Sequence, residues 1–243
     1  HEDVDPCWRM DPLGGPLDGT LAELMRVQAD GLVATPPHLS DAEAATLPCA
    51  ALTAWSALVE EGRVTAGDTV LLQGTGGVSM FALQFCQMLG ARAIVTSSSD
   101  DKLERARSLG AWQTVNYRTT PDWDKAARTL TGQVGVDHVI EVGGAGTLAR
   151  SLRCVRPGGT VSVIGILSGA ASELAITPVL MQQLRLQGIM VGHRDGFERM
   201  TRAISHQGLR PVVDRTFAFA EAPAALQWLE SGRHVGKVVI SGE

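Results

Sequence analysis

The sequence predicts an α/β protein built on a doubly wound parallel sheet, and three observations support this prediction. Val70 to Gln73 is a short apolar run, followed by glycines and then by apolar residues at helical spacing. Similar short apolar runs and helical stretches alternate as far as about residue 191. A hydrophobic content of 44% and a charged content of 19% provide an ample core. Strands joined by helical crossovers form such a sheet.

The alternation predicts six strands and the helices between them. The expected strands are Val70–Gln73, Ile94–Ser97, Thr114–Asn116, Val136–Glu141, Thr160–Ile164 and Arg185–Val191. The expected helices cover about 78–89, 101–109, 122–130, 147–155 and 177–184.

The two ends of the chain are less regular. Residues 1–20 have the composition of turns, and Leu21 to Ala34 could hold one or two short strands. Ser40-Asp-Ala-Glu43 predicts a capped helix start, with Pro48 interrupting that helix before a second one over 53–58. The tail predicts helix 196–206, strand 212–217, helix 222–230 and strand 237–240. Because these are too few for a domain, we expect them to complete a sheet begun by the early residues.

The glycine turn after the first strand predicts a dinucleotide site. It reads Gly74-x-Gly76-x-x-Ser79, with Gly77 and Val78 opening the helix. Glycines let the backbone approach a diphosphate, and the helix start offers free N–H groups to it. A plain structural turn is the alternative for the motif taken alone.

The end of the second strand favours NADPH over NADH. It reads Thr96-Ser97-Ser98-Ser99 with no acid before Asp100, whereas NAD-binding folds place a carboxylate there. Ser97 and Ser98 can donate to a 2′-phosphate, and Lys102 and the pair Tyr117-Arg118 could complete the pocket. Two hydrogen bonds to a charged group would favour NADPH by on the order of a hundredfold. The alternative is that Lys102 and Arg118 are solvated surface charges.

Two further glycine stretches follow strand ends. Glu141-Val-Gly-Gly-Ala-Gly146 is also typical of sites for S-adenosylmethionine, although in methyltransferases that motif lies on the first strand. We favour a loop past the nicotinamide ribose, with Val142 and Gly143 in contact, and place Gly165 and Ile166 near the nicotinamide ring. The alternative for both is an ordinary strand-to-helix turn.

Composition and spacing exclude several other classes. A net charge of −5 argues against nucleic acid, no apolar run approaches about 18 residues, and no Gly-x-Ser-x-Gly elbow occurs. The cysteines Cys7, Cys49, Cys86 and Cys154 are far apart, which excludes the usual spacing of structural zinc ligands. Cys86 lies within a helical pattern and Cys154 near a predicted helix end, which indicates buried free thiols in a reducing, cytoplasmic compartment. His138 lies inside a strand and is expected to be structural. We expect no metal site.

Several motifs now resemble one family. Leu47-Pro-Cys-Ala-Ala-Leu-Thr-Ala-Trp55, the glycine turn, Ser97 to Arg105, Arg156-Pro-Gly-Gly159 and Gly236-Lys-Val-Val-Ile240 resemble the medium-chain dehydrogenase/reductase superfamily. The resemblance is nearest to zinc-independent members like quinone oxidoreductases or alcohol dehydrogenases, and it runs from about residue 14 to the end.

The resemblance implies a Rossmann fold and hydride transfer between NADPH and a carbonyl, enone, quinone or alcohol. It implies that Ser97, Ser98, Lys102 and Tyr117 hold the 2′-phosphate, and it adds Thr53 and Lys237 to the expected cofactor contacts. No catalytic residue can be assigned. Family members begin with a GroES-like catalytic domain, and most of that domain is missing here.

These expectations give a domain division and a set of alternatives. Residues 1–47 would be a remnant of the catalytic domain with a linker, 48–193 the NADP-binding Rossmann domain, and 194–243 a segment returning to the catalytic domain. The incomplete substrate domain favours a non-enzymatic NADPH-binding or sensor protein as the alternative, and a methyltransferase is a remote one. The apolar edge strand 185–191 predicts a homodimer.

Overall fold

The structure is a computed structural model that describes residues 13–15 and 17–242. Cys7 and most of the stretch 1–20 lie outside these residues. The described chain divides into two units, one up to Leu32 together with Gly242, and one over Val33–Ser241. In the first unit the predicted strands over Leu21–Ala34 are wrong: it holds only the 3-10 helix η1 (Ala29–Gly31). Its apolar side chains, such as Leu24, are exposed.

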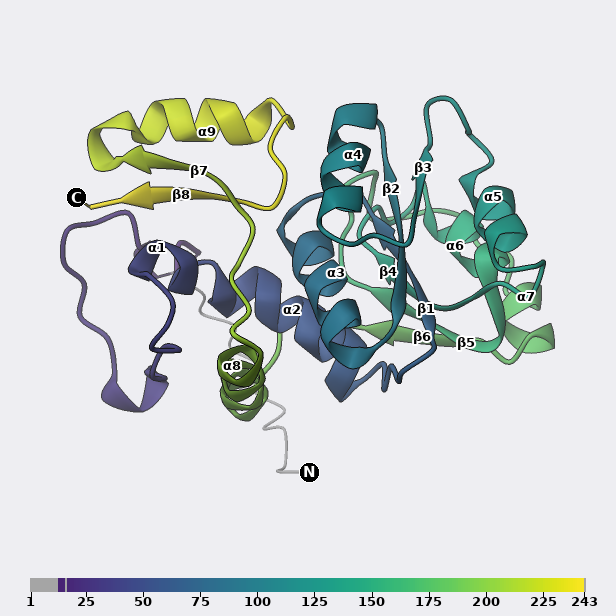
Figure 1. Cartoon of the computed structure of the whole chain (residues 1–243), viewed down its shortest axis with the longest axis horizontal. Coiled ribbons are helices and arrows are strands. Elements are labelled where there is room, and N and C mark those ends of the chain that lie inside the picture. Colours follow the sequence, from purple (N-terminus) through teal and green to yellow (C-terminus); the bar gives the residue numbers. More distant parts are fainter. Residues whose placement is uncertain (1–12, 16, 243) are drawn as a thin grey trace. The chain divides into compact units, whose positions relative to one another are not determined.

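The second unit contains the predicted six-stranded parallel sheet, in the order β3-β2-β1-β4-β5-β6 (Figure 1). This is the doubly wound order: β2 and β3 are added on one side of β1, and β4, β5 and β6 are added on the other side. The strands are β1 (Thr69–Gln73), β2 (Arg92–Ser97), β3 (Gln113–Asn116), β4 (Val136–Glu141), β5 (Val155–Val163) and β6 (Arg185–Gly188). The fold-class prediction is confirmed.

The two faces of the sheet bury alternate residues of the same strands. On β1, Val70 and Leu72 join one core cluster, and Leu71 joins the other. The first cluster includes α3 (Gly77–Leu89) and α4 (Asp100–Ser108), and the second includes α5 (Trp123–Leu130) and α6 (Leu148–Cys154). Figure 1 shows these helix pairs on opposite sides of the sheet. Continuous apolar runs were therefore the correct signal for strands buried on both faces.

A run of helical turns precedes β1. The capping box at Ser40 is confirmed: α1 (Asp41–Ala44) ends ahead of Pro48, and η2 (Leu47–Ala51), α2 (Leu52–Trp55) and η3 (Ser56–Glu60) follow. By length and composition this run of 20 residues could cross a membrane. However, 61% of its apolar window is buried, and α2 packs on α3 as part of the first core cluster.

The tail contradicts one prediction. After α7 (Thr177–Met181) and α8 (Arg194–Gln207), β7 (Val213–Ala218), η4 (Phe219–Glu221), α9 (Ala222–Glu230) and β8 (Lys237–Ser241) form a parallel β-α-β unit (Figure 1). Within the described residues β7 and β8 pair with each other and not with early residues. Because α9 carries the chain back to the start of the unit, β7 and β8 can pair in parallel with each other.

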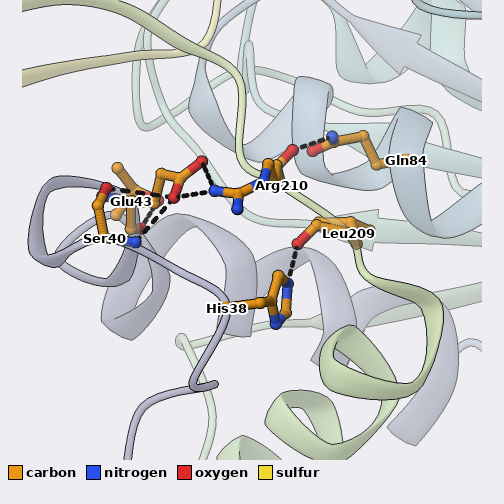
Figure 2. A network of polar contacts seen from close by, with 7 residues as sticks. His38, Ser40, Glu43, Gln84, Leu209 and Arg210 are labelled. Atoms are coloured by element: carbon orange, nitrogen blue, oxygen red, sulfur yellow. Dashed lines mark hydrogen bonds and ion pairs between the residues drawn. The ribbon is translucent and has the colours of Figure 1, made fainter.

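A polar network attaches the segment between α8 and β7 to the helices before β1 (Figure 2). The Arg210 guanidinium donates to Glu43 Oε2 at 2.7 Å and to Oε1 at 2.9 Å. Gln84 of α3 donates to the Arg210 carbonyl at 2.7 Å, and His38 Nε2 lies 3.0 Å from the Leu209 carbonyl. Burial alone would raise the pKa of Glu43, but the hydrogen bonds from Ser40 and Arg210 lower it overall. The carboxylate is therefore charged when it holds the tail in place.

The predicted structural roles of the buried thiols and of His138 are confirmed. Cys86 and Cys154 are buried and free, and burial raises the pKa of the Cys86 thiol to about 12. His138 Nε2 lies 2.8 Å from Ser162 Oγ on β5, and burial lowers its pKa to about 4. The imidazole is therefore neutral at physiological pH.

Candidate functional site

The glycine turn links β1 to an open helix start. Gly74 has a φ of +74°, which favours glycine, and α3 begins at Gly77 with no side chain capping its first N–H groups. The Ser79 hydroxyl, in place of the usual third glycine, donates to the Gln73 carbonyl at 2.6 Å and is buried. A serine is therefore small enough here, and it adds a hydrogen bond to the strand end.

The carboxyl-terminal strand packs against this turn. Gly236 N–H donates to the Thr75 carbonyl at 2.9 Å, and a Cβ on Gly77 would lie 2.7 Å from Lys237 Cδ and 3.1 Å from Ala50 Cβ. Gly236 itself has a φ of +82°, and a Cβ there would lie 2.2 Å from the Val212 carbonyl. The glycines at 77 and 236 therefore permit a close packing of three chain segments.

A cavity of about 650 Å³ opens at the carboxyl ends of the strands. This size lies in the range of small-molecule and cofactor sites. Its walls come from the ends of β1 and β2, from the first turns of α3, α5 and α6, and from the loops after β3, β4 and β5. The lining residues are Gln73, Gly74, Gly76, Gly77, Val78, Ser79, Thr96, Tyr117, Pro121, Trp123, Val142, Gly143, Thr147, Arg150, Ile164, Gly165, Leu167 and Ser168.

Eight of the predicted cofactor residues line this one cavity, although their strand ends are far apart in the sequence. They are Gly74, Gly76, Gly77, Val78, Tyr117, Val142, Gly143 and Gly165. The cavity therefore combines the glycine turn, the loop after β4 and the loop after β5, as ligand sites at a topological switch point do. Their contact with a cofactor stays a prediction.

The other predicted residues lie outside the lining. Thr53 is buried in α2, and its hydroxyl donates to the Cys49 carbonyl at 2.7 Å. Ile166 is 64% exposed, and its neighbour Leu167 lines the cavity instead. Lys237 lies across Gly77 at the outside of the turn.

The residues predicted for the 2′-phosphate meet at the ends of β2 and β3. Tyr117 N–H donates to the Ser97 carbonyl at 3.0 Å, Ser97 is buried and Ser98 is half-buried. The Lys102 ammonium donates to the Gly232 carbonyl of the tail, and desolvation lowers its pKa, opposed in part by Asp214. The first nearby acid, Asp100, accepts from Asn116 Nδ2 at 2.8 Å. This region therefore presents hydroxyls and one ammonium, with the carboxylate engaged elsewhere.

The Glu141 carboxylate, which suggested a methyltransferase, is fully buried and saturated by internal donors. Oε1 accepts from the N–H groups of Gly143 and Gly144, both at 2.9 Å, and from Thr147 Oγ1 at 2.5 Å. Oε2 accepts from Gln73 Nε2 at 2.7 Å and from the Ser151 hydroxyl. Glu141 therefore shapes the loop after β4 and has no free lone-pair direction for a ligand's ribose.

Sequence reasoning missed Gln73 and Ser151 in this cluster. Gln73 Oε1 also accepts from the N–H groups of Val142 and Gly143, both at 3.1 Å, so one amide joins β1 to the loop after β4. The signal available was a polar residue at the end of an otherwise apolar strand, since a buried amide needs several partners.

Among residues 13–15 and 17–242, no group of three or more His, Cys, Asp or Glu is placed to hold a metal ion. These residues therefore do not fit a zinc site.

Comparison with known proteins identifies the family. A model described as "Zinc-binding dehydrogenase" matches residues 77–206, more than half of the chain. A zinc-type alcohol dehydrogenase-like protein of Schizosaccharomyces pombe is 44% identical over 94% of this chain and 68% of its own length. The chain belongs to the medium-chain dehydrogenase/reductase superfamily. Its relatives are oxidoreductases, and the predicted resemblance is confirmed.

Solved structures of this superfamily share the fold. An NAD-dependent alcohol dehydrogenase has a TM-score of 0.88 and 36% identity, covering 95% of this chain and 67% of that one. The 2-octenoyl-CoA carboxylase reductase CinF, in complex with NADP and 2-octenoyl-CoA, has a TM-score of 0.81 and 27% identity, covering 88% and 52%. The chain thus spans about half to two thirds of the length of these medium-chain dehydrogenase/reductase relatives.

Proposed function

We propose that this chain binds NADPH in the cavity at the strand ends and forms the cofactor-binding part of an oxidoreductase. The observation that carries the proposal is that eight residues predicted for the cofactor line one cavity of about 650 Å³ beside an open helix start. Without a Cβ, Gly76 leaves room for a diphosphate, and the free N–H groups of α3 can donate to it. When bound, the nicotinamide supplies the hydride for a carbonyl, enone or quinone, or accepts one from an alcohol.

The preference for NADPH rests on the ends of β2 and β3. β2 does not end in a carboxylate. A carboxylate there would repel a 2′-phosphate and would instead accept hydrogen bonds from the ribose hydroxyls of NADH. Ser98, Lys102 and Tyr117 are available at that place, and the ammonium has donors beyond the one used on Gly232. One solved relative is described as NAD-dependent and another as a complex with NADP, so the choice needs a direct measurement.

The test is the affinity of the full chain for NADPH and NADH, by calorimetry. We expect tighter binding of NADPH, and we expect Lys102→Ala to weaken NADPH binding by roughly tenfold or more while NADH changes little. The matched control is Lys125→Ala, because Lys125 is an exposed lysine on α5 that pairs with Asp122 at the start of that helix. Equal affinities, or a preference for NADH, would contradict the choice of cofactor; stabilisation by S-adenosylmethionine alone would contradict the function.

A second candidate is an NADPH-binding protein or sensor without turnover. The described residues account for a cofactor cavity, and no catalytic residue is assigned among them. Absorbance at 340 nm during incubation with NADPH and quinones or enones separates the two. Robust turnover by this chain alone would contradict the sensor, and binding without turnover would favour it. The saturated Glu141 carboxylate argues against a methyltransferase.

We also propose a homodimer through β6. This strand is an edge of the six-stranded sheet, with β5 as its one partner in the described chain. Leu186 on β6 is 37% exposed and Leu180 on α7 is 75% exposed. An unpaired edge beside apolar side chains favours pairing with a second copy. Light scattering should give twice the chain mass of 25.7 kDa, and a monomer at micromolar concentration would contradict the dimer.

A further inference from the structure

A second cavity, of about 360 Å³, lies apart from the cofactor site and has a size that suits small molecules. α5 and α6 pack side by side, and α7 packs on α6 (Figure 1). The cavity is lined by residues of α5, of the last turn of α6, of the start of β5 and of the position after α7. It shares no lining residue with the first cavity: of two neighbours on α5, Trp123 lines the first and Asp124 the second. A ligand in this second cavity is therefore not the cofactor.

The charged side chains of this cavity leave one positive charge uncompensated. Arg153 Nε donates to Asp124 Oδ2 at 2.7 Å, so the charges of these two residues cancel. Lys125 Nζ lies 2.7 Å from Asp122 Oδ2, so this lysine is paired as well. Arg128 donates only to backbone carbonyls in the described chain, at 2.7, 3.1 and 3.4 Å. Carbonyl dipoles hold its guanidinium group in place but do not neutralise it, so the cavity favours an anion.

One carboxylate oxygen in the wall of this cavity lacks a hydrogen-bond donor. Asp124 is 2% exposed, and its Oδ1 has no partner in the described part of the chain, although Oδ2 accepts from Arg153. A buried acceptor without a donor is costly, so a ligand that brings a donor to Oδ1 gains affinity. The Arg153 side chain, which is 54% exposed, can shift to admit that donor. The ligand that fits therefore carries both a negative charge and a hydrogen-bond donor.

We infer that this cavity binds a protonated oxyanion, with inorganic phosphate as its ligand. At neutral pH phosphate keeps at least one P–OH group, which donates to Asp124 Oδ1. Its other oxygens accept from the Nη groups of Arg153, which have no acceptor in the described chain, and their charge balances that of Arg128. A water molecule supplies the donor without the charge, and sulfate supplies the charge without the donor. The inference goes beyond the proposed function and does not depend on it.

The test compares phosphate with sulfate by calorimetric titration of the full chain, at neutral pH and equal ionic strength. Charge alone would favour sulfate, which is fully ionised. We expect phosphate to bind about tenfold more tightly, because sulfate carries no proton for Asp124 Oδ1. Asp124→Asn should bring the two affinities within about threefold of each other, since an amide can donate to an oxygen of either anion.

A second variant, Arg153→Leu, assigns the binding to this cavity and should weaken phosphate binding about tenfold. The matched control is Arg107→Leu, which removes a similarly exposed arginine from an ion pair on α4 and should leave phosphate binding unchanged. Should Asp124→Asn fail to fold, the two anions on the unsubstituted chain and the two arginine variants decide. No binding of phosphate, equal affinities for phosphate and sulfate, or phosphate binding that is unchanged by Arg153→Leu would overturn the inference. The last result is the one expected if phosphate binds at the glycine turn instead.

Discussion

Gly76→Val should abolish most cofactor binding while leaving the fold intact. Gly76 has a φ of −75°, which any residue adopts, and a Cβ there would meet no atom within 4 Å. It lines the cavity beside the start of α3, so the added side chain would occupy the space that we assign to the diphosphate. Crowding a close contact costs about 1–3 kcal/mol, so we expect NADPH affinity to fall on the order of a hundredfold. Calorimetry with NADPH measures this loss.

The control is Gly31→Ala. This glycine also has open space at its Cβ and no left-handed φ, but it lies in η1 and does not line the cavity. Thermal unfolding of both variants should match that of the unsubstituted chain within about 2 °C, because neither adds a clash. If Gly76→Val binds NADPH normally and is equally stable, the diphosphate does not sit on the glycine turn.

Acid should destabilise the fold through His138 well above the range in which carboxylates titrate. Its pKa is lowered from 6.5 to about 4, mainly by burial, with a further contribution from Arg185. Between these two values the unfolded chain takes up a proton that the folded chain does not, so stability falls as pH falls. From pH 7.5 to pH 5 we expect a loss of about 2 kcal/mol in the free energy of unfolding. Urea unfolding at the two pH values measures it.

His138→Gln should remove most of this pH dependence, whereas His206→Gln should keep it. The pKa of His234 is also lowered, so a smaller loss of stability with falling pH should remain in this variant. The carboxyls of Glu43 and Glu60 do not interfere: their pKa values are lowered from 4.5, so their contributions persist above 4.5 and are lost only at lower pH. Should His138→Gln prove too unstable, an NMR titration of His138 in the unsubstituted protein decides; a normal pKa of about 6.5 would refute the prediction.

The fold was largely predictable because its signals are local. Apolar runs, helical spacing and the Ser40 capping box each lie within a few residues, and the six strands followed from them. The start of β5 was missed, because Arg156-Pro-Gly-Gly159 has the composition of a turn while Val155 already pairs with Val136. The tail was misassigned for a related reason: which strand β7 pairs with depends on residues more than twenty positions away.

The candidate site was predictable where function needs a backbone shape. The glycines at 74, 76 and 77 could be read directly, since they mark a turn and a close approach. Side chains whose partners lie far away in the sequence could not be predicted. Gln73 contacts Glu141 and Ser151, 68 and 78 positions further on, and nothing near Gln73 in the sequence indicates them. The same holds for Lys102 and Gly232, which lie 130 positions apart.

The attachment of Gly236 to Thr75 has a consequence for how nucleotide preference evolves. One stretch of backbone lines the cavity on its inner side and contacts the last strand on its outer side. We therefore expect that substitutions in the final dozen residues can change which nucleotide is accepted, without altering the glycine motif itself. A change of coenzyme preference, by engineering or in evolution, then need not fall in the first half of the domain.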